Sequence, residues 1–100
     1  MTIKMIKHPP CGVEFRLEGR LDTAAAPEVQ DALLAIAQEY EQIQLNFEGL
    51  TYICSAGLRI LLMLQKQANR TGSHLWLTNV NPSILEVFEM TGFGSILQVR

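Results

Sequence analysis

The amino-acid sequence predicts an α/β fold with a central, mostly parallel sheet of about four to five strands, an antiparallel edge and flanking helices. Segments in which apolar and polar residues alternate are interleaved with segments in which apolar residues recur every three or four positions. Strands that alternate with helices are joined by right-handed crossovers, and this makes the strands parallel. Only the first two strands follow each other directly, so they are expected to form an antiparallel hairpin.

The first two strands are predicted at residues 2–7 and 13–18. Val13, Phe15 and Leu17 alternate with charged residues, which is the pattern of a strand with one buried face. The stretch H-P-P-C-G between the two strands holds two prolines and a glycine, which disfavour both a helix and a continued strand. The sequence therefore predicts a turn between two strands at the edge of the sheet.

The first helix is expected after Gly19 and Asp22, which should end the regular part of the second strand. Asp22 and Thr23 are both candidate N-caps, and Pro27 and Glu28 suit a first helical turn. The apolar residues that follow recur at spacings of four, three and four and form one stripe, which consists of Val29, Leu33, Ile36 and Tyr40.

The third strand is expected at 43–47, where I-Q-L-N-F alternates again, and Glu48 and Gly49 should end it. A second helix is then predicted from Ala56 or the residue after it to about Arg70, where a threonine and a glycine follow. Most of its circumference is apolar, but one narrow stripe differs and consists of Arg59, Met63, Lys66 and Arg70.

The C-terminal part is predicted to add a short strand at 75–78 and a third helix. Asn81 is expected to cap this helix, with Pro82 in its first position and Gly92 after its end. The residues expected to face inward are Ile84, Leu85 and Phe88. The stretch I-L-Q-V at 96–99 predicts a further strand.

The size of the chain predicts a single domain that spans residues 1–100, and its cysteine usage and N-terminal sequence predict a cytoplasmic location. A net charge of −2 and a pI of about 5.6 exclude the strongly basic surface that is typical of nucleic-acid binding. The longest apolar run, I-L-L-M-L at 60–64, is too short to insert directly into a membrane, and no signal peptide is predicted. Cys11 and Cys54 form no C-x-x-C pair, and a disulfide between them stays open.

Two junctions between a strand and a helix carry candidate functional residues. They are G-R-L-D-T at 19–23 and T-Y-I-C-S-A-G-L-R at 51–59. If the two strands are neighbours, Asp22 and Ser55 lie at the same edge of the sheet. Ser55 is expected in the first turn of a helix, where free N–H groups favour a phosphate; an ordinary N-cap serine is the alternative. The small alanine and glycine that follow would let another molecule approach closely.

The sequence contains no complete set of catalytic or metal-binding residues. Cys54 could be activated by a helix N-terminus, but Arg59 follows it as C-x4-R, one residue short of the C-x5-R loop of protein tyrosine phosphatases. There is no G-x-S-x-G elbow or P-loop, and His8 and His74 are expected on different parts of the surface. The isolated carboxylates are expected to be solvated, and they are Glu14, Glu18, Glu39 and Glu41. The sequence therefore predicts a protein that is not an enzyme and that has no cofactor and no metal site.

Three stretches resemble the STAS domain family, which includes bacterial anti-sigma factor antagonists and the cytoplasmic tails of sulfate transporters. They are G-R-L-D-T-A-A-A-P-E (19–28), L-N-F-E-G-L-T-Y-I-C-S-A-G-L-R-I-L-L (45–62) and L-T-N-V-N-P-S-I-L-E-V-F-E-M-T-G-F (77–93). They span nearly the whole chain in the expected order, from residue 19 to residue 93, and the middle stretch is quite specific. The resemblance implies a STAS fold, which is similar to the alternation of strands and helices described above.

The resemblance also implies a function in partner switching during transcription regulation. In the antagonists, a serine at the position of Ser55 is phosphorylated by the anti-sigma factor, which is an ATP-dependent serine kinase. The unphosphorylated antagonist binds this kinase and frees a sigma factor, whereas the phosphorylated form is released and is reset by a phosphatase. Ser55 is therefore the expected phosphoacceptor. The expected partner-binding residues are Asp22, Thr23, Cys54, Ala56, Gly57, Arg59 and Met63.

Two positions depart from the family pattern. Cys54 stands where aspartate or serine is common, and Asn46 stands where aspartate is usual, so fewer acids are expected around Ser55. Some STAS domains act without phosphorylation as partners of ATP-driven lipid transporters. That role is the alternative function.

Overall fold

The computed structural model of the chain is a four-stranded mixed sheet with helices on one of its faces. Its elements are β1 (Thr2–His8), β2 (Gly12–Leu21), α1 (Ala26–Ala37), β3 (Gln42–Ile53), α2 (Ser55–Thr71), β4 (His74–Thr78), α3 (Pro82–Thr91) and the short 3-10 helix η1 (Phe93–Ser95). The strand order is β1-β2-β3-β4, with β1 antiparallel to β2 and the other neighbours parallel. The predicted α/β fold with an antiparallel edge is confirmed.

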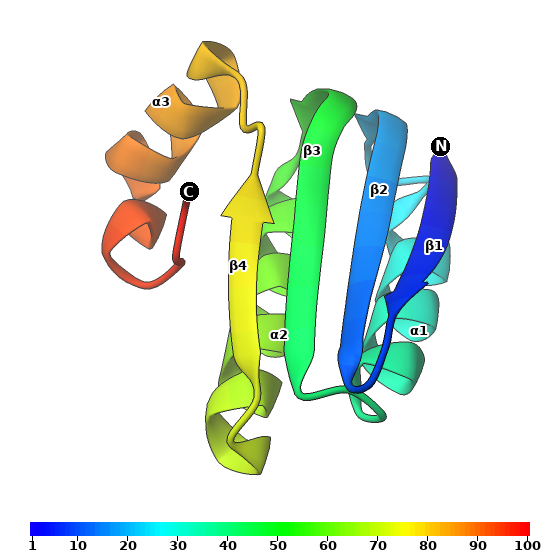
Figure 1. Cartoon of the computed structure of the whole chain (residues 1–100). Coiled ribbons are helices and arrows are strands. Elements are labelled where there is room, and N and C mark those ends of the chain that lie inside the picture. The colour runs from blue at the N-terminus through cyan, green and yellow to red at the C-terminus, as the bar shows by residue number, and fades with distance from the viewer.

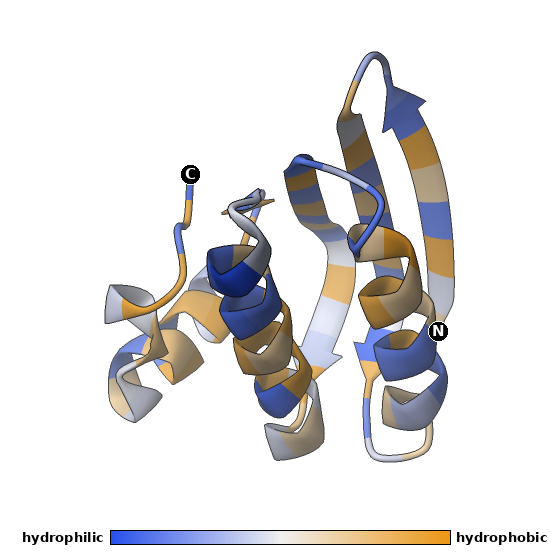
Figure 2. Cartoon of the chain, turned by 90° about the horizontal axis from the view of Figure 1, so that it is seen from below, coloured by the Kyte–Doolittle hydropathy of each residue, from blue (hydrophilic) through white to orange (hydrophobic).

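The helices divide the sheet into a covered face and an open face. Figure 1 shows α1 and α2 behind the sheet, α3 beside β4, and no helix in front of the strands. Seen from below in Figure 2, α1 and α2 lie side by side on the same face. The open face is therefore lined by the side chains that alternate with the core residues of each strand.

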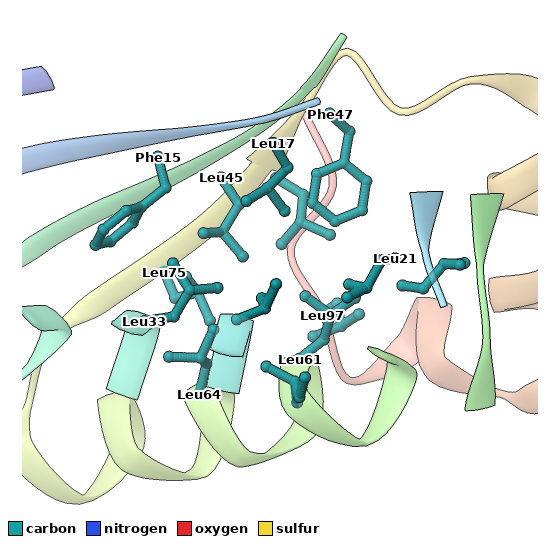
Figure 3. Packing of buried hydrophobic residues seen from close by; sticks show 14 of the residues in the cluster. Phe15, Leu17, Leu21, Leu33, Leu45, Phe47, Leu61, Leu64, Leu75 and Leu97 are labelled. Atoms are coloured by element: carbon teal, nitrogen blue, oxygen red, sulfur yellow. The ribbon is translucent and has the colours of Figure 1, made fainter. Parts of the chain in front are cut away.

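The hydrophobic core lies between the sheet and the helices α1 and α2. Phe15 and Leu45 from the strands pack toward Leu33 of α1 and Leu64 of α2, as Figure 3 shows, and all four side chains are buried. Burying one such side chain is worth about 1.5–3 kcal/mol, so this layer contributes strongly to the stability of the fold. The predicted buried positions of β2 and the first part of β3 are confirmed.

Strands β2 and β3 are longer than predicted, because each continues past a glycine that was expected to end it. β2 passes through Gly19, which has a φ of +102°, and ends at Leu21. The expectation that Glu48 and Gly49 end the third strand is wrong, because β3 continues to Ile53. Two register shifts between these strands act as β-bulges and keep the pairing intact on both sides. Both strands consequently reach the same edge of the sheet.

The helix boundaries follow the predicted signals in part. α1 begins at Ala26, so neither Asp22 nor Thr23 is its N-cap. α2 begins at Ser55, earlier than predicted. At α3 the Asn81 side chain accepts a hydrogen bond from the Ile84 N–H at 3.0 Å, and Pro82 and Gly92 stand at the predicted ends.

The C-terminal segment differs from the prediction in two respects. Ile84 and Phe88 are buried, as expected, but Leu85 is 36% exposed, so its predicted inward position is wrong. The stretch at 96–99 forms no strand and makes only an isolated bridge between Leu77 and Val99.

One carboxylate on the open face is buried, against the prediction that Glu14 is solvated. Glu14 is only 5% exposed, and its carboxylate accepts hydrogen bonds from Asn46 Nδ2 at 3.0 Å and Arg16 Nε at 2.9 Å. His8 Nε2 lies 3.2 Å from the same carboxylate. The hydrogen bond from Asn46, together with those from Arg16 and His8, lowers the pKa of Glu14 to about 2, although burial acts in the opposite direction.

Replacing Glu14 by glutamine should remove a pH-dependent part of the stability. Because the pKa of Glu14 is about 2 in the folded chain and 4.5 ordinarily, its ionised form stabilises the fold fully above pH 4.5 and loses this effect as the pH falls toward 2. The difference in unfolding free energy between the native chain and Glu14→Gln should therefore be largest above pH 4.5 and shrink below it. Urea denaturation at a series of pH values measures this difference.

The matched control is Glu18→Gln, which removes an exposed ion pair with Lys4 and should change stability by less than about 1 kcal/mol. A pH-independent difference for Glu14→Gln would contradict the role assigned to this carboxylate.

Candidate functional site

The candidate site lies where β2 and β3 end at the same edge of the sheet. Leu21 and Ile53 are partners in the parallel ladder, and the Cys54 N–H donates a hydrogen bond to the Leu21 carbonyl oxygen at 2.9 Å. The chain then turns from β2 toward α1 and from β3 into α2, both of which cover the same face (Figure 1). The loop that contains Asp22 and the start of α2 with Ser55 therefore meet at one edge, as the sequence predicts.

Ser55 is exposed and is the first residue of α2. The N-cap is Cys54, whose backbone is extended and whose side chain makes no capping hydrogen bond, so Ser55 is not an ordinary N-cap serine. The first hydrogen bond of the helix runs from the Leu58 N–H to the Cys54 carbonyl oxygen at 3.0 Å. The N–H groups before Leu58 thus have no capping side chain, and they favour negative charge at this end of the helix.

Asp22 orders the neighbouring loop. Its Oδ1 accepts a hydrogen bond from the Ala25 N–H at 3.0 Å, and its carbonyl oxygen accepts one from the Ala26 N–H at 3.0 Å. These two bonds fix the turn that leads into α1, and they leave Thr23 exposed. Asp22 therefore contributes a fixed, half-buried carboxylate to this edge of the sheet.

The Cα of Gly57 faces the protein interior, at the contact between α2 and the ends of β2 and β3. A Cβ at this position would lie 2.8 Å from Ile53 Cγ1 and 2.8 Å from Leu21 Cγ, and the residue is buried. The missing side chain of Gly57 therefore lets α2 pack against the ends of β2 and β3, while the contact of Gly57 with a partner stays a prediction. Ala56, by contrast, is partly exposed.

The predicted stripe on α2 lies on the side of the helix that faces α1. Arg59 is exposed and borders an open hollow of about 300 Å³ between the first turns of the two helices, together with Thr23 and Ala56. Met63 is partly exposed and borders a second hollow of about 250 Å³ with Arg70. Four of the seven predicted partner-binding residues therefore border these two hollows between α1 and α2, and they are Thr23, Ala56, Arg59 and Met63.

An exposed pair at the same edge was not predicted from the sequence. The guanidinium carbon of Arg20 lies 4.2 Å from the centroid of the Tyr52 ring, and the two residues are partners in the ladder of β2 and β3. Such a cation–π pair holds both side chains in place at the surface. The signal in the sequence is that each residue directly precedes the buried residue that ends its strand.

Asn46 does not belong to the surroundings of Ser55. It lies on the open face, where its Oδ1 accepts hydrogen bonds from the Glu48 N–H at 3.0 Å and from Asn79 Nδ2 at 3.1 Å. Asn46 stands seven positions before Ile53 in β3, which corresponds to roughly 20 Å of strand. The expectation that residue 46 sets the number of acids around Ser55 is therefore wrong.

Three further observations concern the cysteines, the possible metal ligands and the helices. Cys11 and Cys54 are free, so no disulfide joins them. The side chains of His, Cys, Asp and Glu form no cluster of three or more that could hold a metal ion. None of the helices has the length and apolar character that crossing a lipid bilayer requires.

Comparisons with known proteins agree on one family. The family described as "Mlab, STAS domain" matches residues 7–98. BtrV of Bordetella bronchiseptica, whose name assigns it to the anti-sigma factor antagonists, is 37% identical over 84 residues, which cover 83% of this chain and 72% of BtrV. The anti-sigma-B factor antagonist of Staphylococcus aureus is 29% identical over 88 residues, which cover 87% of this chain and 82% of that protein.

A solved structure shows the same fold over nearly the whole chain. The anti-sigma factor antagonist SpoIIAA in its unphosphorylated form superimposes with a TM-score of 0.82 at 25% identity. The match covers 99% of this chain and 88% of SpoIIAA.

Replacing Gly57 by alanine should destabilise the fold at the candidate site. The added Cβ would press on the buried side chains of Leu21 and Ile53, and overpacking of this kind costs about 1–3 kcal/mol. The better helix propensity of alanine offsets at most about 1 kcal/mol of this loss. Urea denaturation of Gly57→Ala should therefore give a lower unfolding free energy than that of the native chain.

The matched control is Gly94→Ala, since no atom lies within 4 Å of a Cβ at position 94. A Gly57→Ala variant as stable as the native chain would show that α2 can move away from the strand ends at no cost.

Proposed function

The chain belongs to the STAS domain family, and we propose that it acts in that family as an anti-sigma factor antagonist switched by phosphorylation. In its unphosphorylated form it binds an anti-sigma factor serine kinase and so releases a sigma factor. The kinase brings ATP and transfers a phosphate to Ser55, which ends the complex, and a phosphatase restores the first state. The observation that carries this proposal is the exposed position of Ser55 in the first turn of α2, beside the Asp22 loop.

The named relatives support the antagonist function more than the alternative. Both BtrV and the Staphylococcus aureus protein carry the name of anti-sigma factor antagonists and match most of this chain. The SpoIIAA structure is designated as the unphosphorylated form, which distinguishes it from a phosphorylated state of that protein. A role as a partner of an ATP-driven lipid transporter, without phosphorylation, is therefore not favoured.

The charge of a phosphate explains how one modification ends binding without unfolding the protein. Phosphorylation adds about −1.5 to −2 charges, which the N–H groups at the start of α2 offset in part. In a complex the same group would be packed against the partner and near the Asp22 carboxylate, where desolvation and like-charge repulsion oppose it. A loss of about 3 kcal/mol in binding free energy lowers the affinity more than a hundredfold.

The docking face in this proposal is the edge that carries Ser55 together with the two hollows between α1 and α2. Thr23, Ala56 and Arg59 form its centre, and Met63 extends it along α2. A methionine side chain adapts its shape to a partner, and arginine is common at the centre of protein interfaces. The chain contributes a surface and an acceptor hydroxyl, whereas ATP and the catalytic groups belong to the kinase, so we propose that the chain itself is not an enzyme.

Ser55 should be the single residue that the kinase modifies. When the purified chain is incubated with ATP and an anti-sigma factor serine kinase encoded in the same genome, its intact mass should rise by one phosphate group. Ser55→Ala should gain no phosphate, because the acceptor hydroxyl is absent. The matched control is Ser83→Ala, which removes an exposed hydroxyl in the first turn of α3, outside the docking face, and should still gain one phosphate. Equal phosphorylation of Ser55→Ala would refute the assignment of the acceptor.

A permanent negative charge at Ser55 should weaken the complex. Ser55→Asp places one charge at the start of α2 and should lower the affinity for the kinase at least about tenfold, which corresponds to about 1.4 kcal/mol. Ser55→Ala should bind as the native chain does. Isothermal titration calorimetry with the ADP-bound kinase measures both, and circular dichroism verifies that the variants are folded. Equal affinities of Ser55→Asp and Ser55→Ala would place the docking face elsewhere.

A further inference from the structure

Arg59 lies one helical turn after Ser55 on α2. Residues four positions apart on a helix have Cβ atoms about 5–6 Å from each other, so these two side chains are neighbours. Helical side chains also lean toward the N-terminus of the helix, and the long arginine side chain therefore extends toward the turn that holds Ser55. An acidic group placed before a basic group at this spacing is the favourable order on a helix.

The guanidinium of Arg59 has no ionic partner within the chain. The salt bridges of the structure join Lys4 to Glu18 and join His8 and Arg16 to Glu14, so none involves α2. Asp31 of α1 borders the same hollow as Arg59, but its carboxylate is not within salt-bridge distance of the guanidinium. The exposed guanidinium of Arg59 is therefore available to bind an anion beside the hollow.

A phosphate on Ser55 would bring three acceptor oxygens within reach of this guanidinium. Arginine binds phosphate through two parallel hydrogen bonds, and its charge does not titrate in the physiological range. We propose that Arg59 binds the phosphate of phosphorylated Ser55 within the same chain, and that this contact withdraws Arg59 from the docking face. The proposal rests on the proposed phosphorylation of Ser55.

The contact between Arg59 and the phosphate gives phosphorylation a second effect on the docking face, which is the loss of a free cation. In the unphosphorylated chain, Arg59 offers a free cation that suits a carboxylate on the partner. After phosphorylation the same cation is held by the phosphate, so the partner meets a new anion and also loses its basic contact. The switch then combines repulsion with the removal of an attractive residue, and Arg59 is a positioning residue for the phosphate.

The first test measures the contact without a kinase. The chain is produced with phosphoserine inserted at position 55 during translation, and the phosphate is titrated by ³¹P NMR. Its second pKa should be lower in the native background than in Arg59→Gln, because the guanidinium favours the dianion. The matched control is Lys66→Gln, which removes an exposed cation of the same stripe about 16 Å along the helix from position 55 and should leave the titration unchanged. Identical titrations of the native and Arg59→Gln chains would overturn the proposal.

The second test measures the effect on binding. The affinity of each chain for the ADP-bound anti-sigma factor kinase is determined with serine and with phosphoserine at position 55. When unphosphorylated, Arg59→Gln should bind the kinase severalfold more weakly than the native chain does. Phosphoserine at position 55 should then lower the affinity of Arg59→Gln by a smaller factor than it lowers the affinity of the native chain. An equal fold-loss in both backgrounds would show that the phosphate does not act through Arg59.

The outcomes separate this proposal from the proposed function. If the kinase does not phosphorylate Ser55, the proposed function fails, while the titration of inserted phosphoserine still measures the Arg59 contact. If the kinase phosphorylates Ser55 and the titration does not depend on Arg59, the switch remains and only the intramolecular contact is refuted.

Discussion

The close contact between the start of α2 and the ends of β2 and β3 determines the rest of the site. Gly57 faces Leu21 and Ile53 at a distance that leaves no room for a side chain, and the Cys54 N–H is bound to the Leu21 carbonyl oxygen. These contacts fix where the helix begins and which of its sides faces outward. Ser55 is therefore exposed, because the residue two positions later must be buried.

Because both long helices pack on one face of the sheet, the other face carries a polar network around Glu14. With α1 and α2 on one face only, the alternating residues of β2 and β3 have no helix to cover them (Figure 1). Glu14 is nevertheless buried, because Arg16, Asn46 and His8 surround its carboxylate and donate hydrogen bonds to it. A buried carboxylate with several donors is stable, whereas one without them would cost several kcal/mol. The open face is thus held together by polar contacts, and the covered face by apolar packing.

Local patterns predicted the elements whose signals are complete within a few residues. The α3 helix has its cap, its proline and its terminal glycine in sequence, and the structure keeps all three. The ends of β2 and β3 were misplaced, because bulges accommodate Gly19 and Gly49 inside the strands and depend on the pairing of the two strands. The burial of Glu14 depends on Asn46, 32 residues away, and the inward direction of Gly57 depends on Leu21. A single sequence does not reveal such distant contacts.

The first turn of α2 separates a structural side from a functional side. Gly57 and Leu58 are buried, whereas Ser55 and Arg59 are exposed. A phosphate on Ser55 can therefore alter charge and hydrogen bonding at the surface without disturbing the packing that fixes the helix. Since the helix is fixed by the strand ends, the two states of the proposed switch share one backbone and differ in electrostatics. A partner that binds this edge must therefore distinguish the two states by the phosphate charge and by the position of the Arg59 side chain, because the fold is the same in both.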